Sequence, residues 1–80
     1  MIYQVEFNST ISKNVVKAFQ EIHTRGVYHG DVRVENILVR KDNSIALIDF
    51  EMSEMNVDKE LLKEEMRQVL SLLTGLRRRH

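Results

Sequence analysis

The sequence predicts an α+β fold in which a helix, a loop, a β-hairpin and a second helix follow one another. Two stretches carry apolar residues at helical spacing, and two short β-branched runs between them flank a turn. Eighty residues are enough for one small domain or for a piece of a larger one, so we expect a single unit over residues 1–80. A chain of this size buries only about 60% of its unfolded surface, which predicts marginal stability.

The first third of the chain predicts a strand and then a helix. Residues 1–8 begin with a loosely alternating apolar pattern, which is typical of a short strand. The serines and threonine of NSTIS are candidate N-caps, because their oxygens can accept hydrogen bonds from a first helical turn. We predict a helix over residues 11–25 that ends at Gly26 in a left-handed conformation. Its apolar face repeats at four, three and four residues: Ile11, Val15, Ala18 and Ile22.

The middle of the chain predicts a β-hairpin over residues 37–48. Its two apolar runs flank Lys41-Asp42-Asn43-Ser44, in which Asp and Asn favour a turn. A turn centred on Asp42-Asn43 would place Leu38 opposite Leu47. The same register would place Asn36 opposite Asp49 at the open end of the ribbon.

This predicted register brings oxygen-bearing side chains together. Opposed residues lie only about 4.5–5.5 Å apart, and Asp31 is on the loop that enters the same end. An amide oxygen beside a carboxylate suits Mg²⁺, and a further carboxylate could orient or deprotonate an attacking hydroxyl. These groups would be the minimum machinery for phosphoryl transfer. The alternative is ordinary capping, since Asp and Asn are common at turns and strand ends.

The last third predicts a helix over residues 58–75, with Gly75 and the Arg77–Arg79 run at its C-terminal end. We interpret the arginines as a solvated helix end rather than an anion site, and His23 on the first helix as a surface or capping residue. The leucine-rich stripe is expected to be core, but any part without cover would favour association. That stripe comprises Leu62, Met66, Val69, Leu73 and Leu76, widened by Leu61, Leu70 and Leu72.

Composition excludes several classes of function. Twelve Lys and Arg balance twelve Asp and Glu, so charge does not indicate nucleic acid as a partner. The absence of cysteine excludes disulfides and thiolate metal sites. No apolar run approaches the roughly 18 residues of a membrane helix, and the N-terminus does not resemble a secretory signal. We therefore expect a soluble, cytoplasmic chain.

Two motifs resemble those of protein kinases. HGDVRVEN, at residues 29–36, is similar to the catalytic loop H-R-D-L-K-P-E-N, and IDFE, with its DFG-like part at 49–51, is similar to the metal-binding D-F-G motif. The resemblance covers roughly residues 11–52 and implies a partial C-terminal lobe that uses ATP and Mg²⁺. It implies Asp31 as catalytic base, Arg33 as a phosphate-contacting cation, Asn36 and Asp49 as Mg²⁺ ligands, and Leu38 under the adenine ring. It also implies that His29 and Phe50 hold the loop.

Departures from the kinase pattern refine this prediction. Gly30 replaces an arginine that in many protein kinases contacts the phosphorylated activation loop. Glu51 replaces the last glycine of D-F-G, and no A-P-E motif follows. The chain is in this respect more similar to small fungal kinase-like proteins and to choline and aminoglycoside kinases. The departures disfavour regulation by loop phosphorylation and a protein substrate.

The eighty residues also contain no G-x-G-x-x-G loop and no V-A-I-K-like strand lysine. We therefore expect a truncated module whose phosphate transfer to a hydroxyl is impaired unless a complementary N-terminal lobe is supplied. The alternative is a non-catalytic, pseudokinase-like interaction domain that associates through the helix at 58–75.

Overall fold

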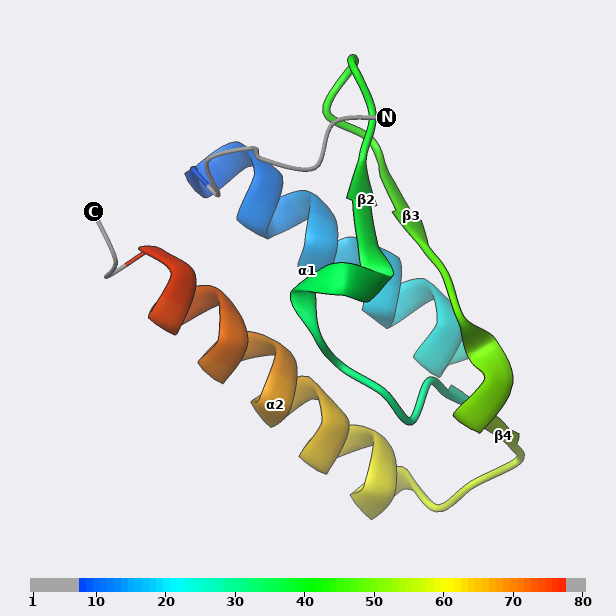
Figure 1. Ribbon diagram of the computed structural model, residues 1–80. Helices are drawn as coiled ribbons and strands as arrows, with labels where there is room; N and C mark the ends of the chain where they lie inside the picture. Colours follow the sequence, from blue (N-terminus) through cyan, green and yellow to red (C-terminus); the bar gives the residue numbers. More distant parts are fainter. Residues whose placement is uncertain (1–7, 78–80) are drawn as a thin grey trace.

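The computed structural model describes residues 8–77, with side chains through residue 76, and has the predicted α+β fold. Two helices pack against a β-hairpin and against a second, shorter pair of strands (Figure 1). The predicted strand at residues 1–8 lies outside the described residues except for Asn8. In chain order the elements are α1 (Ser9–Thr24), β1 (Val27–Tyr28), η1 (Val34–Asn36), β2 (Ile37–Val39), β3 (Ile45–Leu47), η2 (Phe50–Met52), β4 (Glu54–Met55) and α2 (Lys59–Arg77).

Helix α1 begins two residues before the predicted bound and ends one residue before it. Its N-cap is Asn8, whose side-chain oxygen accepts a hydrogen bond from the amide of Ile11 at 2.9 Å. At the other end Gly26 has a φ of 77°, the left-handed conformation predicted for it, and its amide donates to the carbonyl of His23. Local capping chemistry thus fixes both ends of the helix.

The predicted hairpin register is wrong by one residue. Leu38 lies opposite Ala46 rather than Leu47, so the residue opposite Asn36 is Ile48 and not Asp49. The amide of Ile48 donates to the carbonyl of Asn36 at 3.0 Å, which extends the pairing to the open end. Asn36 and Asp49 therefore do not lie opposite each other across the two strands, contrary to the prediction from the sequence.

The reason for the shift is a three-residue loop where a two-residue turn was expected. Asn43 adopts a left-handed conformation with a φ of 68°, and the amide of Arg40 donates to the carbonyl of Ser44. The amide and hydroxyl of Ser44 both donate to Asp42, which holds the pKa of that carboxyl below its usual value. From α1, the side chain of Asn14 donates to the carbonyl of Asn43 at 2.8 Å. The turn is thus fixed partly by a contact remote in sequence.

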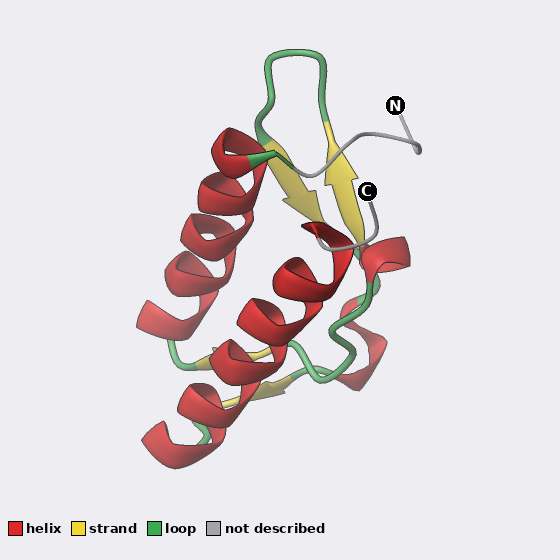
Figure 2. Cartoon of the chain, turned by 90° about the vertical axis from the view of Figure 1, so that its left-hand side faces the viewer, coloured by secondary structure: helices red, strands yellow, loops and turns green. Residues whose placement is uncertain are grey.

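The core lies between the two helices and the inner face of the hairpin. Figure 2 shows the helices side by side, with the β2–β3 hairpin at one end and the β1–β4 pair at the other. None of the described helices is long and apolar enough to cross a membrane. The buried residues of the core cluster are Ile11, Val15, Phe19, Ile37, Val39, Val69 and Leu73.

Helix α2 buries two residues of its predicted apolar stripe and covers four others in part. Val69 and Leu73 are in the core, and Met66, Leu72 and Leu76 pack against it and are partly buried. Leu61 and Leu70 are the exposed leucines of this described helix. They are nine residues apart, so at about 100° per residue they point to opposite sides. The two leucines therefore do not form one continuous apolar seam.

The segment between β3 and α2 folds back onto the loop after β1. Val27 pairs with Met55 and Tyr28 with Glu54 in the β1–β4 ladder. Gly30 has a φ of 89°, and a Cβ atom there would lie 2.3 Å from the carbonyl oxygen of Met52. This close approach requires glycine at position 30.

We expect Gly30→Ala to lower the free energy of unfolding by about 1–3 kcal/mol, because the added methyl group overlaps backbone and the φ is unfavourable. Urea denaturation measures this change. The matched control is Gly75→Ala, where an added Cβ meets nothing within 4 Å. That change should raise stability by up to about 1 kcal/mol, as expected within a helix. Equal stability of Gly30→Ala and the wild type would contradict the close approach.

Candidate active site

His29 joins the candidate catalytic loop to the end of strand β3. Its ring Nδ1 accepts a hydrogen bond from the amide of Asp31 at 3.2 Å, which assigns the ring proton to Nε2. Nε2 then donates to the carbonyl of Ile48 at 2.8 Å. The fully buried ring also contacts Phe19 and Phe50, with centroid separations of 6.0 and 4.6 Å. The backbone of Asp31 and that of the residue before Asp49 are thereby connected through one side chain.

A fully buried carboxylate on α2 holds the backbone of the same loop. Glu65 Oε1 accepts from the amide of His29 at 2.9 Å, and Oε2 accepts from the amide of Gly30 at 2.8 Å. Oε1 also lies 2.8 Å from His23 Nε2. Both oxygens of Glu65 therefore act as acceptors, as an ionised carboxylate does.

The sequence interpretation of His23 was wrong, and it did not single out Glu65. The side chain of His23 is only 11% exposed, because it packs beside Phe19 and contacts Glu65. A signal was present in both helices: His23 follows Phe19 by four residues, and Glu65 precedes Val69 by four. A polar residue on an apolar helical face needs a buried partner.

The side chains of the candidate catalytic loop form one hydrogen-bonded group. Asn36 Nδ2 donates to the carbonyl and to Oδ2 of Asp31, at 2.9 and 3.1 Å. Arg33 Nε lies 3.1 Å from Oδ1 of the same carboxylate. Asp31 is only partly buried, so it keeps access to a ligand. The structure therefore brings together three of the residues predicted from the sequence.

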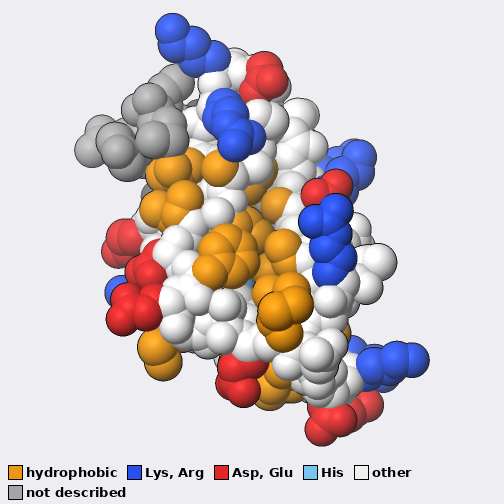
Figure 3. Space-filling view, turned by 90° about the vertical axis from the view of Figure 1, so that its right-hand side faces the viewer, with side chains coloured by type: hydrophobic (Ala, Val, Ile, Leu, Met, Phe, Trp, Pro, Cys, Tyr) orange, Lys and Arg blue, Asp and Glu red, His pale blue; other side chains and the backbone are white. Residues whose placement is uncertain are grey.

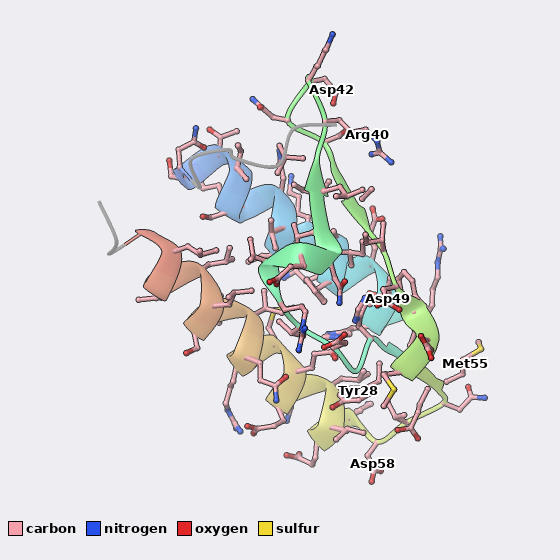
Figure 4. The ribbon with its side chains drawn as sticks, in the orientation of Figure 1. Tyr28, Arg40, Asp42, Asp49, Met55 and Asp58 are labelled. Carbon is pink, nitrogen blue, oxygen red and sulfur yellow. The ribbon has the colours of Figure 1, made fainter. Side chains whose placement is uncertain are left out.

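Asp49 reaches the same end of the hairpin by a different route from the one predicted. It is exposed and left-handed, with φ 59° and ψ 69°, and it lies where the chain turns from β3 into η2 (Figure 4). Asn36 immediately precedes β2, so both residues belong to the open end. Among residues 8–76, no hydrogen bond joins Asp49 to the Asp31 group.

The oxygen chemistry of this end fits a small, hard cation. Both hydrogen bonds of the Asn36 side chain use its nitrogen, which leaves Oδ1 available as an acceptor. Asp49 contributes a solvent-accessible carboxylate. Mg²⁺ commonly takes one or two protein oxygens and completes its shell with water and phosphate. The described part of the chain holds no cluster of three or more His, Cys, Asp or Glu that would suit another metal.

Leu38 lies on the strand between these polar groups and the hairpin tip. It is buried but is not among the members of the core cluster, which includes its neighbours Ile37 and Val39. The alternation of side chains along β2 places Leu38 on the other face of the ribbon. Figure 3 views the molecule from the hairpin side and shows apolar side chains gathered in the middle of that surface.

The chain is also similar to two known kinases and to a synthase. At 42% identity over 41 residues, it matches the hormonally up-regulated neu tumor-associated kinase of Homo sapiens, with 51% of this chain and 6% of that protein covered. At 42% identity over 45 residues it matches the serine/threonine-protein kinase kin-29 of Caenorhabditis briggsae, covering 56% and 6%. A probable SapB synthase of Streptomyces coelicolor is 46% identical over 41 residues, covering 51% and 4%.

These relatives are far longer than the chain, which spans about 6% of the human kinase. One of the three is named as a serine/threonine-protein kinase and another as a kinase, and the predicted likeness to choline and aminoglycoside kinases stays a prediction. No solved structure matches the chain with significance. The family model described as protein kinase domain matches residues 2–70, which include the candidate catalytic loop, the hairpin and the first part of α2. The chain therefore belongs to the protein kinase domain family.

Proposed function

We propose that the chain is the catalytic-loop part of a phosphotransferase that passes a phosphate from ATP·Mg²⁺ to a hydroxyl. The observation that carries this proposal is the His29 side chain, which bonds both the amide of Asp31 and the carbonyl of Ile48. It couples the position of a candidate base to that of a candidate metal ligand. Catalysis of phosphoryl transfer depends largely on such positioning.

Asp31 is the proposed general base. Asn36 and Arg33 each contact its carboxylate, which restricts the rotation of the side chain. Its partial exposure leaves room for an incoming hydroxyl. Arg33 is itself 60% exposed, so it can exchange its contact with Asp31 for one with a substrate phosphate. The pair would then orient the acceptor and neutralise charge on the transferred group.

Asn36 and Asp49 are the proposed Mg²⁺ ligands. Their oxygen atoms belong to the same end of the hairpin, and Mg²⁺ would connect them through its own coordination sphere and bound water. When bound, the ion would supply charge stabilisation for the phosphates. Leu38, on the next part of β2, is the proposed apolar support for the adenine ring.

A complementary N-terminal lobe is proposed to cover the bound nucleotide and to contact its phosphates. The eighty residues contain neither a glycine-rich loop nor a strand lysine for the phosphates. Ile48 and Phe50 are exposed beside the candidate site, at 37% and 39%, and offer an apolar face for that lobe. The proposal includes a cytoplasmic location and an acceptor hydroxyl on a protein or a small molecule.

We expect a divalent cation to bind at the open end of the hairpin. Mn²⁺, a paramagnetic substitute for Mg²⁺, should broaden amide signals near Asn36 and Asp49 in a titration followed by NMR. Asp49→Asn should weaken this effect by about tenfold or more, because it removes the charged oxygen ligand. Asp42→Asn, at the hairpin tip, is the matched control and should leave the broadening at the open end unchanged. Equal broadening in the Asp49 variant would exclude Asp49 as a ligand.

The chain alone should show very weak or undetectable ATP hydrolysis and phosphate transfer with Mg²⁺. Loss of one charge-stabilising group can lower the rate by about 10²–10³, and the N-terminal lobe would supply several such groups. Phosphate release and radiolabel transfer measure this activity. Robust turnover that Asp31→Asn abolishes would show that the eighty residues suffice for catalysis.

Glu65→Gln should lower the free energy of unfolding by about 1–3 kcal/mol, because the new amide nitrogen faces a backbone N–H that it cannot satisfy. Urea denaturation gives the change, and amide chemical shifts of His29 and Gly30 report the loop. Glu64→Gln is the control, since Glu64 is exposed and its described ion pair is with the exposed Arg67. This change should alter stability by less than about 0.5 kcal/mol. A Glu65 variant with wild-type stability and unchanged loop shifts would contradict the anchoring role.

A further inference from the structure

An apolar groove lies between the start of α1 and the end of α2, away from the candidate active site. It has a volume of about 440 Å³ and is lined by apolar carbons of Val16, Leu70 and Leu73, with Lys13 and Lys17 on its rim. Leu70 is half exposed there, and none of the residues lining the groove is acidic. The groove is therefore suited to an apolar segment that carries negative charge.

The opposite end of the molecule presents such a segment. Among the side chains that the structure describes, Met52 and Met55 are the most exposed large apolar ones, at 62% and 68%. Glu51, Glu54 and Asp58 alternate with them and are also exposed. We call residues 51–58 the acidic methionine segment. Figure 3 shows apolar and acidic side chains together at the lower edge of the molecule.

We propose that the groove of one copy of the chain binds the acidic methionine segment of a second copy. Unbranched methionine side chains adapt to an irregular apolar groove, and the carboxylates beside them would face the two rim lysines. The twelve positive and twelve negative side chains cancel in number but are unevenly distributed between these two surfaces. Charge complementarity thus favours a second copy as the occupant.

The position of the two surfaces predicts how such copies assemble. The start of α1 and the end of α2 lie at one end of the molecule, and β4 lies at the other (Figure 1), while Figure 4 places Met55 and Asp58 at that second end. The longest dimension of the molecule is 35 Å, so the two surfaces are well separated. A head-to-tail contact leaves one groove and one segment free in every pair. Such contacts add further copies instead of stopping at a dimer.

Sedimentation of the full chain from micromolar to millimolar concentration tests the proposal. We expect the mean mass to rise continuously with concentration and to fall when salt screens the lysines. Lys13→Glu/Lys17→Glu and Met52→Glu/Met55→Glu should each raise the apparent dissociation constant by about tenfold or more. All four side chains are exposed, so circular dichroism should show that both variants fold.

A mixing experiment separates this contact from a symmetric one. The Lys13→Glu/Lys17→Glu variant keeps an intact acidic methionine segment, and the Met52→Glu/Met55→Glu variant keeps an intact groove. Each variant alone should therefore be monomeric, while a mixture of the two should form a one-to-one complex. Lys41→Glu at the hairpin tip and Leu61→Glu on the far side of α2 are matched controls that should associate like the wild type. A monomeric wild type at every concentration, a mixture that does not associate, or association lost only in Leu61→Glu would overturn the proposal.

Discussion

The buried carboxylate of Glu65 is the interaction on which the rest of the structure depends. A carboxylate without partners would be costly in a core of this size, and Glu65 is stable there because two backbone amides and His23 surround it. These partners come from α1 and from the loop after β1, while Glu65 belongs to α2. One side chain therefore fixes the two helices and the loop relative to one another, and with them the backbone that leads into Asp31.

The loop held by Glu65 in turn sets the geometry of the candidate site. Its first residue, His29, uses both ring nitrogens to join the amide of Asp31 to the carbonyl of Ile48. Its second, Gly30, lies against the backbone of Met52, so the segment that follows β3 closes over the loop. At position 30, many of the protein kinases that the chain resembles have an arginine that contacts a phosphorylated segment. This chain has Gly30, whose backbone lies directly against that of Met52. This contact fixes the segment after β3 against the loop, while the absence of regulation by phosphorylation stays a prediction from the sequence.

The small size of the chain explains why it retains unused apolar surface. The core cluster is confined to one face of each helix and to the inner side of the hairpin, which leaves Leu70 and the two methionines of the acidic methionine segment outside it. A further lobe beside Ile48 and Phe50 and a second copy at the groove would cover different parts of this surface. The two proposed contacts, with an N-terminal lobe and with a second copy, would therefore use different residues of the molecule.

The sequence by itself determined the α+β order of elements, the approximate bounds of both helices and the grouping of Asp31, Arg33 and Asn36 on one loop. These features depend on residues close in sequence: apolar spacing, capping side chains and a contiguous motif. Only the tertiary structure decided the hairpin register, because residues 41–44 suit both a two-residue and a three-residue turn, and the contact of Asn14 with Asn43 accompanies the longer one. It also decided the pairing of His23 with Glu65, which are 42 residues apart. A polar residue on an apolar helical face shows that a buried partner is needed, but the packing of the helices determines which residue that partner is.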